Sequence, residues 1–135
     1  MLYSISHQRY ITETPHRRFY ETCCARLSEA QFRKIFAELN GRIDSSEIHT
    51  SSWIPGAKWR GTLYYPILRD ACRYDEDAAA KFFGLILWDV MLKRPEAWAF
   101  GRYEKNNIPI EGLTYFQIEP QLQSRQSPRR SKKKK

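Results

Sequence analysis

Hydrophobic positions are densest in residues 76–94, where their spacing predicts a long helix near the centre of the fold. Asp75 is a suitable N-cap for this helix, and Pro95 ends it because proline cannot continue a helix. Gly84 lowers the helix propensity, which indicates that another element crosses closely there. A helix that is apolar around most of its circumference is expected to be buried. The apolar residues are Ala79, Phe82, Phe83, Leu85, Ile86, Leu87, Val90, Met91 and Leu92.

A second helix is predicted for residues 29–39, which follow a capping-box sequence. Ser28 and Gln31 have the spacing at which each side chain satisfies a backbone N–H at the helix start. Asn40 and Gly41 are suited to a left-handed C-cap, so we expect the helix to end there. The apolar residues that fall on one face are Phe32, Ile35, Phe36 and Leu39.

Two further helices have weaker signals. Thr14 followed by Pro15 is typical of a helix start, which predicts a helix over residues 15–26. Another is expected over residues 62–72, where Pro66 lies close enough to the start to be tolerated. The chain therefore contains about four helices.

The strand signals lie at the two ends of the chain and in one central segment. Residues 97–104 and 108–118 are predicted to form a hairpin around residues 105–107, which contain two asparagines suited to a tight turn. Polar and apolar residues also alternate in residues 2–6 and 47–52. We expect an α+β fold: about four helices, one of them central and largely buried, packed on a small antiparallel sheet that contains the C-terminal hairpin.

Positive charge is concentrated at the C-terminus. Of the 23 basic residues, seven lie in residues 120–135, which contain no acid, whereas residues 1–119 hold 16 basic and 15 acidic residues. The C-terminal segment also has almost no apolar side chains, which is the composition of a disordered chain. We therefore predict one globular α+β domain over residues 1–119 and a disordered basic tail over residues 120–135.

The tail predicts binding to a polyanion, because clustered cations neutralise phosphates and release counterions. A nucleic acid, DNA or RNA, is the partner that we expect first. The alternatives are a tail that improves solubility and a tether to a ribosome or a membrane surface. The residues expected to contact phosphates here are Arg125, Arg129, Arg130, Lys132, Lys133, Lys134 and Lys135.

A second candidate surface lies in the irregular segment between residues 43 and 61. Indole rings can stack on bases or on a small ligand, and neighbouring cations can hold phosphates. The competing interpretation is that the tryptophans anchor a long loop onto the core. The residues concerned are His49, Trp53 and Trp59 for stacking or ligand binding, and Lys58 and Arg60 for nucleic-acid binding.

No catalytic, cofactor or metal signature stands out. The chain has no phosphate-binding glycine loop, no dinucleotide-binding glycine motif, no His-Glu-x-x-His and no Gly-x-Ser-x-Gly. Cys23, Cys24 and Cys72 do not have the number or spacing of a disulfide framework or a zinc site, so we interpret them as buried or half-buried thiols in a reducing compartment. We expect no enzyme activity, cofactor or metal.

These patterns favour a small intracellular regulatory protein that binds nucleic acid without catalysis. Two alternatives stay open. One is a protein-interaction module, such as an inhibitor or accessory subunit, that uses exposed aromatics of the hairpin. The other is a ligand-binding domain or small enzyme with its site between His49 and Arg60. No secretory signal or membrane-spanning stretch is evident, so we expect a cytoplasmic location, or a nuclear or nucleoid-associated one.

Overall fold

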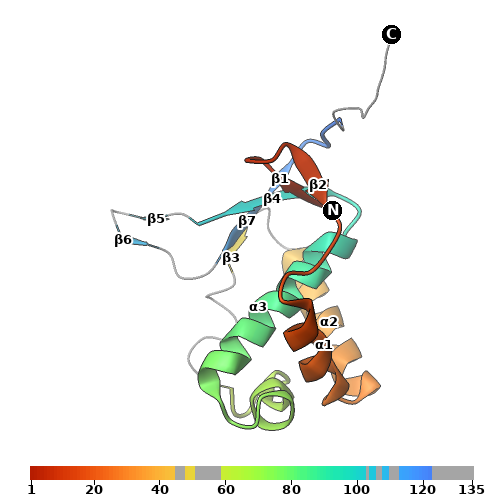
Figure 1. The fold of residues 1–135 in the computed structure, drawn as a ribbon, viewed down its shortest axis with the longest axis vertical. Helices are drawn as coiled ribbons and strands as arrows, with labels where there is room; N and C mark the ends of the chain where they lie inside the picture. Colours follow the sequence, from red (N-terminus) through yellow and green to blue (C-terminus); the bar gives the residue numbers. More distant parts are fainter. Residues whose placement is uncertain (45–47, 51–58, 103, 106–107, 110–112, 123–135) are drawn as a thin grey trace.

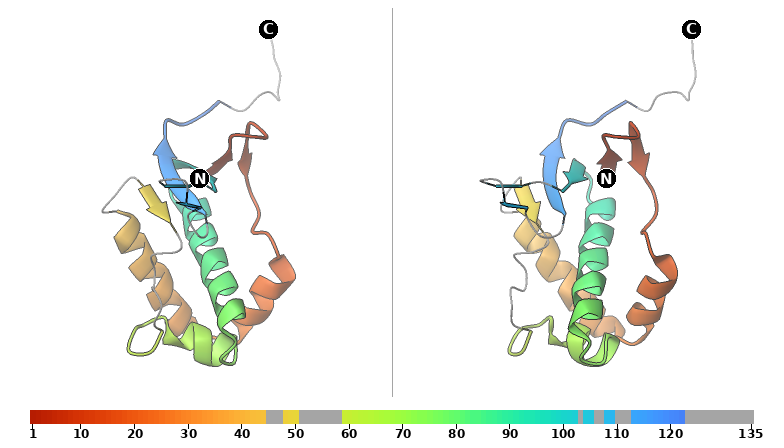
Figure 2. Two further views of the ribbon diagram at one scale, coloured as in Figure 1. Left: turned by 90° about the vertical axis from the view of Figure 1, so that its left-hand side faces the viewer. Right: turned by 60° about the vertical axis from the view of Figure 1, so that its left-hand side comes forward.

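Helix α3 (Glu76–Lys93) lies between α1 (Arg17–Ala25) and α2 (Glu29–Ile43), and the strands gather around its C-terminal end (Figure 1; Figure 2). This description comes from a computed structural model, which describes residues 1–44, 48–50, 59–102, 104–105, 108–109 and 113–122. The predicted tail beyond residue 122 and the segment 51–58 are outside the described residues. The fold is α+β, as expected from the sequence.

The expected central helix is confirmed. The side chain of Asp75 accepts a hydrogen bond from the backbone N–H of Ala78 at 3.1 Å, which caps α3 as predicted. The close crossing expected at Gly84 is wrong, because a Cβ added there would meet nothing within 4 Å. The buried residues of α3 are Ala79, Phe82, Phe83, Leu85, Ile86, Leu87, Trp88, Asp89, Val90 and Met91.

Helix α2 begins as predicted but ends later. Both hydrogen bonds of the capping box formed by Ser28 and Gln31 are present. The helix continues through Asn40 to Ile43, which is only 2% exposed. Nη1 of Arg94 also donates to the backbone and side-chain oxygens of Asn40, at 3.2 and 3.0 Å. These tertiary contacts outweigh the local preference for a C-cap at Asn40.

The two weaker helix predictions are also corrected. Helix α1 starts at Arg17, two residues later than expected, after His16 in a left-handed conformation with φ 51° and no side-chain cap. In the segment 62–72 the regular helix is the short π-helix η2 (Ile67–Ala71), at the end of α3 opposite the sheet (Figure 1).

The predicted hairpin is confirmed. Strand β4 (Ala97–Gly101) pairs antiparallel with β7 (Thr114–Ile118), from Ala97 opposite Ile118 to Gly101 opposite Thr114. The hairpin is extended by β5 (Glu104–Lys105) and β6 (Ile108–Pro109), which also pair antiparallel. The two other expected strands are present as β1 (Leu2–Ser4) and β3 (Ile48–Thr50).

The five-stranded sheet has the order β2-β1-β4-β7-β3, where β2 is Arg9–Ile11, and it is mixed rather than purely antiparallel. Strand β1 runs parallel to β4, with Leu2 opposite Trp98. At the start of β1, the Met1 ammonium donates to the carbonyls of Met91 and Glu96 at 3.0 and 2.9 Å. Alternating side chains predict a strand but contain no information about its direction.

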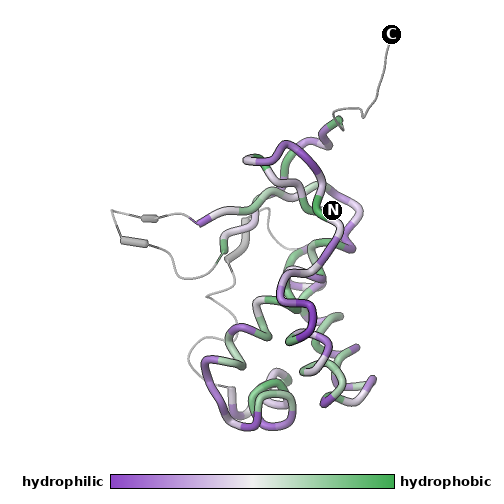
Figure 3. The backbone as a smooth tube through the Cα atoms, in the orientation of Figure 1, coloured by the Kyte–Doolittle hydropathy of each residue, from purple (hydrophilic) through white to green (hydrophobic). Residues whose placement is uncertain are grey.

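The core lies where α3 meets the sheet and the flanking helices. The largest fully buried side chains include Trp98 and Tyr115 from the hairpin and Phe82 from α3. The start of α1 is hydrophilic, whereas α3 is largely hydrophobic (Figure 3). None of the helices in the described ranges is both long and apolar enough to cross a membrane.

Candidate functional site

Only two of the residues predicted to bind nucleic acid or a ligand have described side chains. These are Trp59 and Arg60, just before the turn that leads to η2. His49 is placed by its backbone, in β3 opposite Tyr115. The remaining predicted residues lie outside the described part of the chain: Trp53, Lys58, Arg125, Arg129, Arg130, Lys132, Lys133, Lys134 and Lys135.

Trp59 is half-buried and packs against the core. Its ring lies edge-on to that of Phe83, with the centroids 6.4 Å apart. Its carbonyl accepts hydrogen bonds from the Thr62 side chain at 2.7 Å and the Thr62 backbone at 3.3 Å. These contacts fix the backbone next to Arg60, so Trp59 helps to position an exposed cation.

Arg60 belongs to a cluster that we call the arginine–tyrosine surface, formed by Arg60, Tyr65, Arg69 and Tyr74. The guanidinium carbons of Arg60 and Arg69 lie 5.4 and 5.3 Å from the centre of the Tyr65 ring. Tyr65 and Tyr74 meet edge to face at 6.4 Å, and their hydroxyls are 3.2 Å apart. The surface therefore combines π faces with planar cations, two groups that stack on nucleobases.

An unusual backbone presents Tyr74 to solvent. The π-helix η2 ends with a hydrogen bond from the Cys72 N–H to the Ile67 carbonyl at 3.0 Å. Arg73 and Tyr74 then both adopt left-handed conformations, with φ of 53° and 68°. A 2.7 Å hydrogen bond from the Tyr74 N–H to the Leu68 carbonyl holds this turn. As a result, Tyr74 is 54% exposed.

Asp70 sets the charge of this surface. Its two carboxylate oxygens accept from Nε and Nη2 of Arg69 at 2.8 and 2.9 Å, and Arg69 lowers the pKa of Asp70 below its ordinary value. Nε2 of Gln31 donates to the same carboxylate at 3.3 Å, which links the surface to α2. Asp70 thus neutralises Arg69, whereas no described carboxylate forms an ion pair with Arg60.

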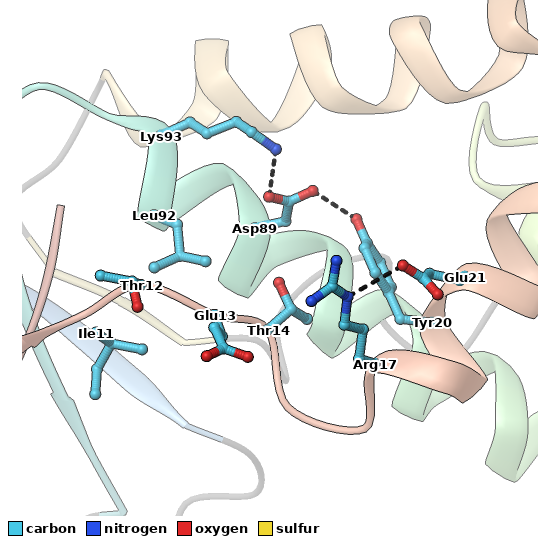
Figure 4. Close-up of a pocket in the computed structure, with 10 residues that line it drawn as sticks. All are labelled: Ile11, Thr12, Glu13, Thr14, Arg17, Tyr20, Glu21, Asp89, Leu92 and Lys93. Atoms are coloured by element: carbon cyan, nitrogen blue, oxygen red, sulfur yellow. Dashed lines mark hydrogen bonds and ion pairs between the residues drawn. The ribbon is translucent and has the colours of Figure 1, made fainter.

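A separate pocket of about 550 Å³ lies between α1, α3 and the segment that leads from β2 to α1 (Figure 4). Its size is within the range of small-molecule sites. Ile11 and Leu92 supply apolar wall, and Thr12 and Thr14 supply hydroxyls. The full lining is Ile11, Thr12, Glu13, Thr14, Arg17, Tyr20, Glu21, Asp89, Leu92 and Lys93.

The buried carboxylate of Asp89 joins two of the pocket's walls. The Tyr20 hydroxyl donates to Oδ2 of Asp89 at 2.8 Å, and Nζ of Lys93 donates to Oδ1 at 2.6 Å (Figure 4). Burial raises the pKa of Tyr20 above its ordinary value, and the Asp89 carboxylate raises it further. Tyr20 therefore stays protonated and acts as a donor. Nearby, burial raises the pKa of Cys24 to about 11.

Carboxylates outnumber cations in the pocket. Arg17 and Glu21 form an exposed ion pair at 3.1 Å on its rim. The backbone carbonyl of Glu13 accepts from Nε1 of Trp88 at 3.1 Å, whereas no residue in the described ranges pairs with the Glu13 side chain. The pocket lining therefore contains three acidic side chains, those of Glu13, Glu21 and Asp89, and two basic ones, those of Arg17 and Lys93.

The sequence interpretation missed most of these residues. Tyr65 and Arg69 are four positions apart, a spacing that places an aromatic and a cationic side chain on one helical face. The sequence pattern otherwise predicts an ordinary helix in this segment. In the pocket, Asp89 and Lys93 have the spacing of a helical ion pair, but nothing local indicates that Tyr20 completes the contact.

The described residues contain no group of three or more His, Cys, Asp or Glu side chains that could hold a metal ion. Of the described hairpin aromatics, Trp98 and Tyr115 are each 1% exposed, Phe100 packs on Trp88 with ring centroids 4.8 Å apart, and Phe116 is half-buried. No protein-family model, curated protein or solved structure matches the chain significantly.

Proposed function

We propose that the protein binds nucleic acid, without catalysis, and that its cationic C-terminal residues supply the attraction to phosphates. The observation that carries this proposal is the uneven neutralisation of charge. In the described helices, five basic side chains pair with nearby carboxylates, whereas residues 123–135 contain seven cations and no acid. The ion pairs are Arg17–Glu21, Arg33–Glu29, Arg42–Glu38, Arg69–Asp70 and Lys93–Asp89.

The start of the tail is placed on the sheet side of the molecule. The backbone N–H of Gln121 donates to the Tyr10 hydroxyl at 2.7 Å, beside β2. Leu122, the next residue, is 91% exposed. The cations that follow are therefore connected to the fold at a site remote from η2 (Figure 1).

The test compares the full chain with a variant of equal length in which each of Lys132, Lys133, Lys134 and Lys135 is replaced by Gln. Fluorescence anisotropy with labelled single-stranded and duplex oligonucleotides gives the affinity at several salt concentrations. If about six phosphates are neutralised, the affinity falls on the order of a thousandfold between 50 and 200 mM salt. The Gln variant should bind more weakly and show a shallower salt dependence.

The same affinity and salt slope in both proteins would refute the proposal. A matched control replaces the exposed Arg18, Arg33, Lys34 and Lys81 of the helices with Gln, which changes the net charge by the same four units outside the tail. This control should alter the salt slope less than the tail variant does.

The pocket around Asp89 favours a second candidate function, the binding of a small organic cation. Its excess of carboxylates attracts an ammonium group, and Ile11 and Leu92 would contact an alkyl chain. Thermal unfolding with 1,4-diaminobutane, or with succinate at equal ionic strength, tests this candidate. The diamine should raise the melting temperature of the wild type and should raise that of Glu13→Gln less. Stabilisation by succinate alone would contradict it.

A further inference from the structure

We propose that the arginine–tyrosine surface binds unpaired nucleobases, so that the protein prefers single-stranded to double-stranded nucleic acid. This inference rests on the proposed nucleic-acid function and adds a second contact to it. The surface is formed by Arg60, Tyr65, Arg69 and Tyr74, at the end of α3 remote from the sheet (Figure 1).

The first argument is conformational strain. A left-handed conformation costs a residue other than glycine roughly 1–2 kcal/mol, and two such residues follow each other at Arg73 and Tyr74. Glycine or asparagine would adopt this turn at lower cost. Strained residues persist where the surrounding structure holds them and cluster at functional sites. Here the strain has a specific result, because it exposes a tyrosine ring beside a second one.

The second argument is the chemistry of the exposed groups. Tyr74 is 54% exposed and touches Tyr65 edge to face, so its own ring has area to offer a flat partner. Bases stack on aromatic rings and on guanidinium planes, and this contact is available only where a base is unpaired. Arg60 lies next to the rings and can pair with the phosphate of the same nucleotide.

The third argument is the division of charge. Asp70 neutralises Arg69 and holds its guanidinium over Tyr65, so this surface contributes stacking more than net attraction. The tail contributes charge without base contacts. Binding through the tail depends steeply on salt, whereas stacking at Tyr74 does not. The two contacts can therefore be separated by experiment.

The test replaces Tyr74 with Gly in the full chain. Glycine accepts a φ of 68° without strain, so the variant removes the ring while the turn is retained. A melting temperature within a few degrees of the wild type verifies the fold. The matched control is Tyr74→Phe, which keeps the ring and loses only the hydroxyl.

Anisotropy measurements use four labelled probes: a 12-nucleotide oligo(dT), an oligo(U) of the same length, a duplex, and a 12-nucleotide abasic strand. Tyr74→Gly should weaken binding to oligo(dT) or oligo(U) roughly 5- to 150-fold, the range for loss of one stacked base. Binding to the duplex and to the abasic strand should change less than twofold, as should every affinity of Tyr74→Phe. The two single strands show whether the ribose matters.

Equal losses on all four probes, or no loss on any, would overturn this inference. If Tyr74→Gly binds every probe like the wild type while the tail variant does not, the surface has another partner and the proposed function still stands. If neither variant changes the binding of any probe, both proposals fail.

Discussion

The hydroxyl of Tyr20 donates a 2.8 Å hydrogen bond to Oδ2 of Asp89, which joins α1 to α3 in the lining of the pocket (Figure 4). Both residues are buried, and the second oxygen of Asp89 accepts from Lys93. Tyr20→Phe should therefore lower the free energy of unfolding by about 1.5–3 kcal/mol, the range for a hydrogen bond to a charged group. Urea unfolding measures the change.

The exposed Tyr74→Phe variant is the control for this prediction. Among the described residues, the Tyr74 hydroxyl bonds only to that of Tyr65, at 3.2 Å on the surface, so the stability should change by less than about 0.5 kcal/mol. Equal effects of the two substitutions would show that the buried hydrogen bond does not stabilise the fold.

Glu96 predicts a pH-dependent contribution to stability. Burial by itself raises the pKa of Glu96, but hydrogen bonds from Arg94 at 2.7 Å and from Trp98 at 3.0 Å outweigh it and lower the pKa below the ordinary value of 4.5. The ionised carboxylate therefore stabilises the fold above pH 4.5. This contribution is lost as the pH falls through the lower pKa of the folded state.

The experiment compares the wild type with Glu96→Gln by urea unfolding between pH 7 and pH 3. The wild type should be more stable at pH 7, and the difference should shrink below pH 4.5. A difference that stays constant over this range would contradict the assignment.

Two glycines are expected to respond in opposite ways to substitution by alanine. Gly84 lies inside α3, and a Cβ there would meet nothing within 4 Å. Gly84→Ala should raise the free energy of unfolding by about 0.5–1 kcal/mol, because alanine favours helix and restricts the unfolded chain. Gly61 has φ +79°, so Gly61→Ala should destabilise the protein by about 1–2 kcal/mol. Thermal unfolding of both variants checks the two signs together, and a destabilising Gly84→Ala would indicate an unseen contact.

The three cysteines are predicted to react slowly in the folded protein. Cys23 and Cys72 are buried and Cys24 is half-buried, which agrees with the sequence interpretation of them as ordinary thiols. Burial raises the pKa of Cys72 to about 12, and that of Cys24 to about 11. Few thiolates are therefore present at pH 7.5, and the thiolate is the reactive form.

Absorbance with a disulfide reagent at pH 7.5 measures the rate of this reaction. The folded protein should react over hours and the urea-unfolded protein within minutes. Rapid reaction of one thiol in the folded protein would show that its surroundings stabilise the thiolate.

The parts of the fold that the sequence predicted are those set by neighbouring residues. The N-cap at Asp75, the capping box of Ser28 with Gln31, and the hairpin of β4 and β7 depend on side chains a few positions apart or on the alternation of one segment. The spacing of the hydrophobic residues then predicts which face of each element packs into the core.

The parts that it missed depend on contacts between distant segments. Helix α2 passes Gly41 because Arg94, from the end of α3, binds Asn40. The pocket needs Tyr20 and Asp89, which lie 69 positions apart, to meet. Such partners cannot be inferred from local patterns, because tertiary contacts select among local conformations of similar energy.

The parallel pairing of β1 with β4 has a consequence for the order in which the chain can fold during synthesis. Strand β1 lies between β2 and β4, so Leu2 cannot find its neighbour Trp98 until the ribosome has made most of the polypeptide. Closing so long a loop carries a large entropic cost and slows the search. The nascent N-terminal hairpin of β1 and β2 would emerge with one unpaired edge, and two strands alone are marginally stable in water. The second edge of β1 therefore stays unpaired until β4 (Ala97–Gly101) has been synthesised.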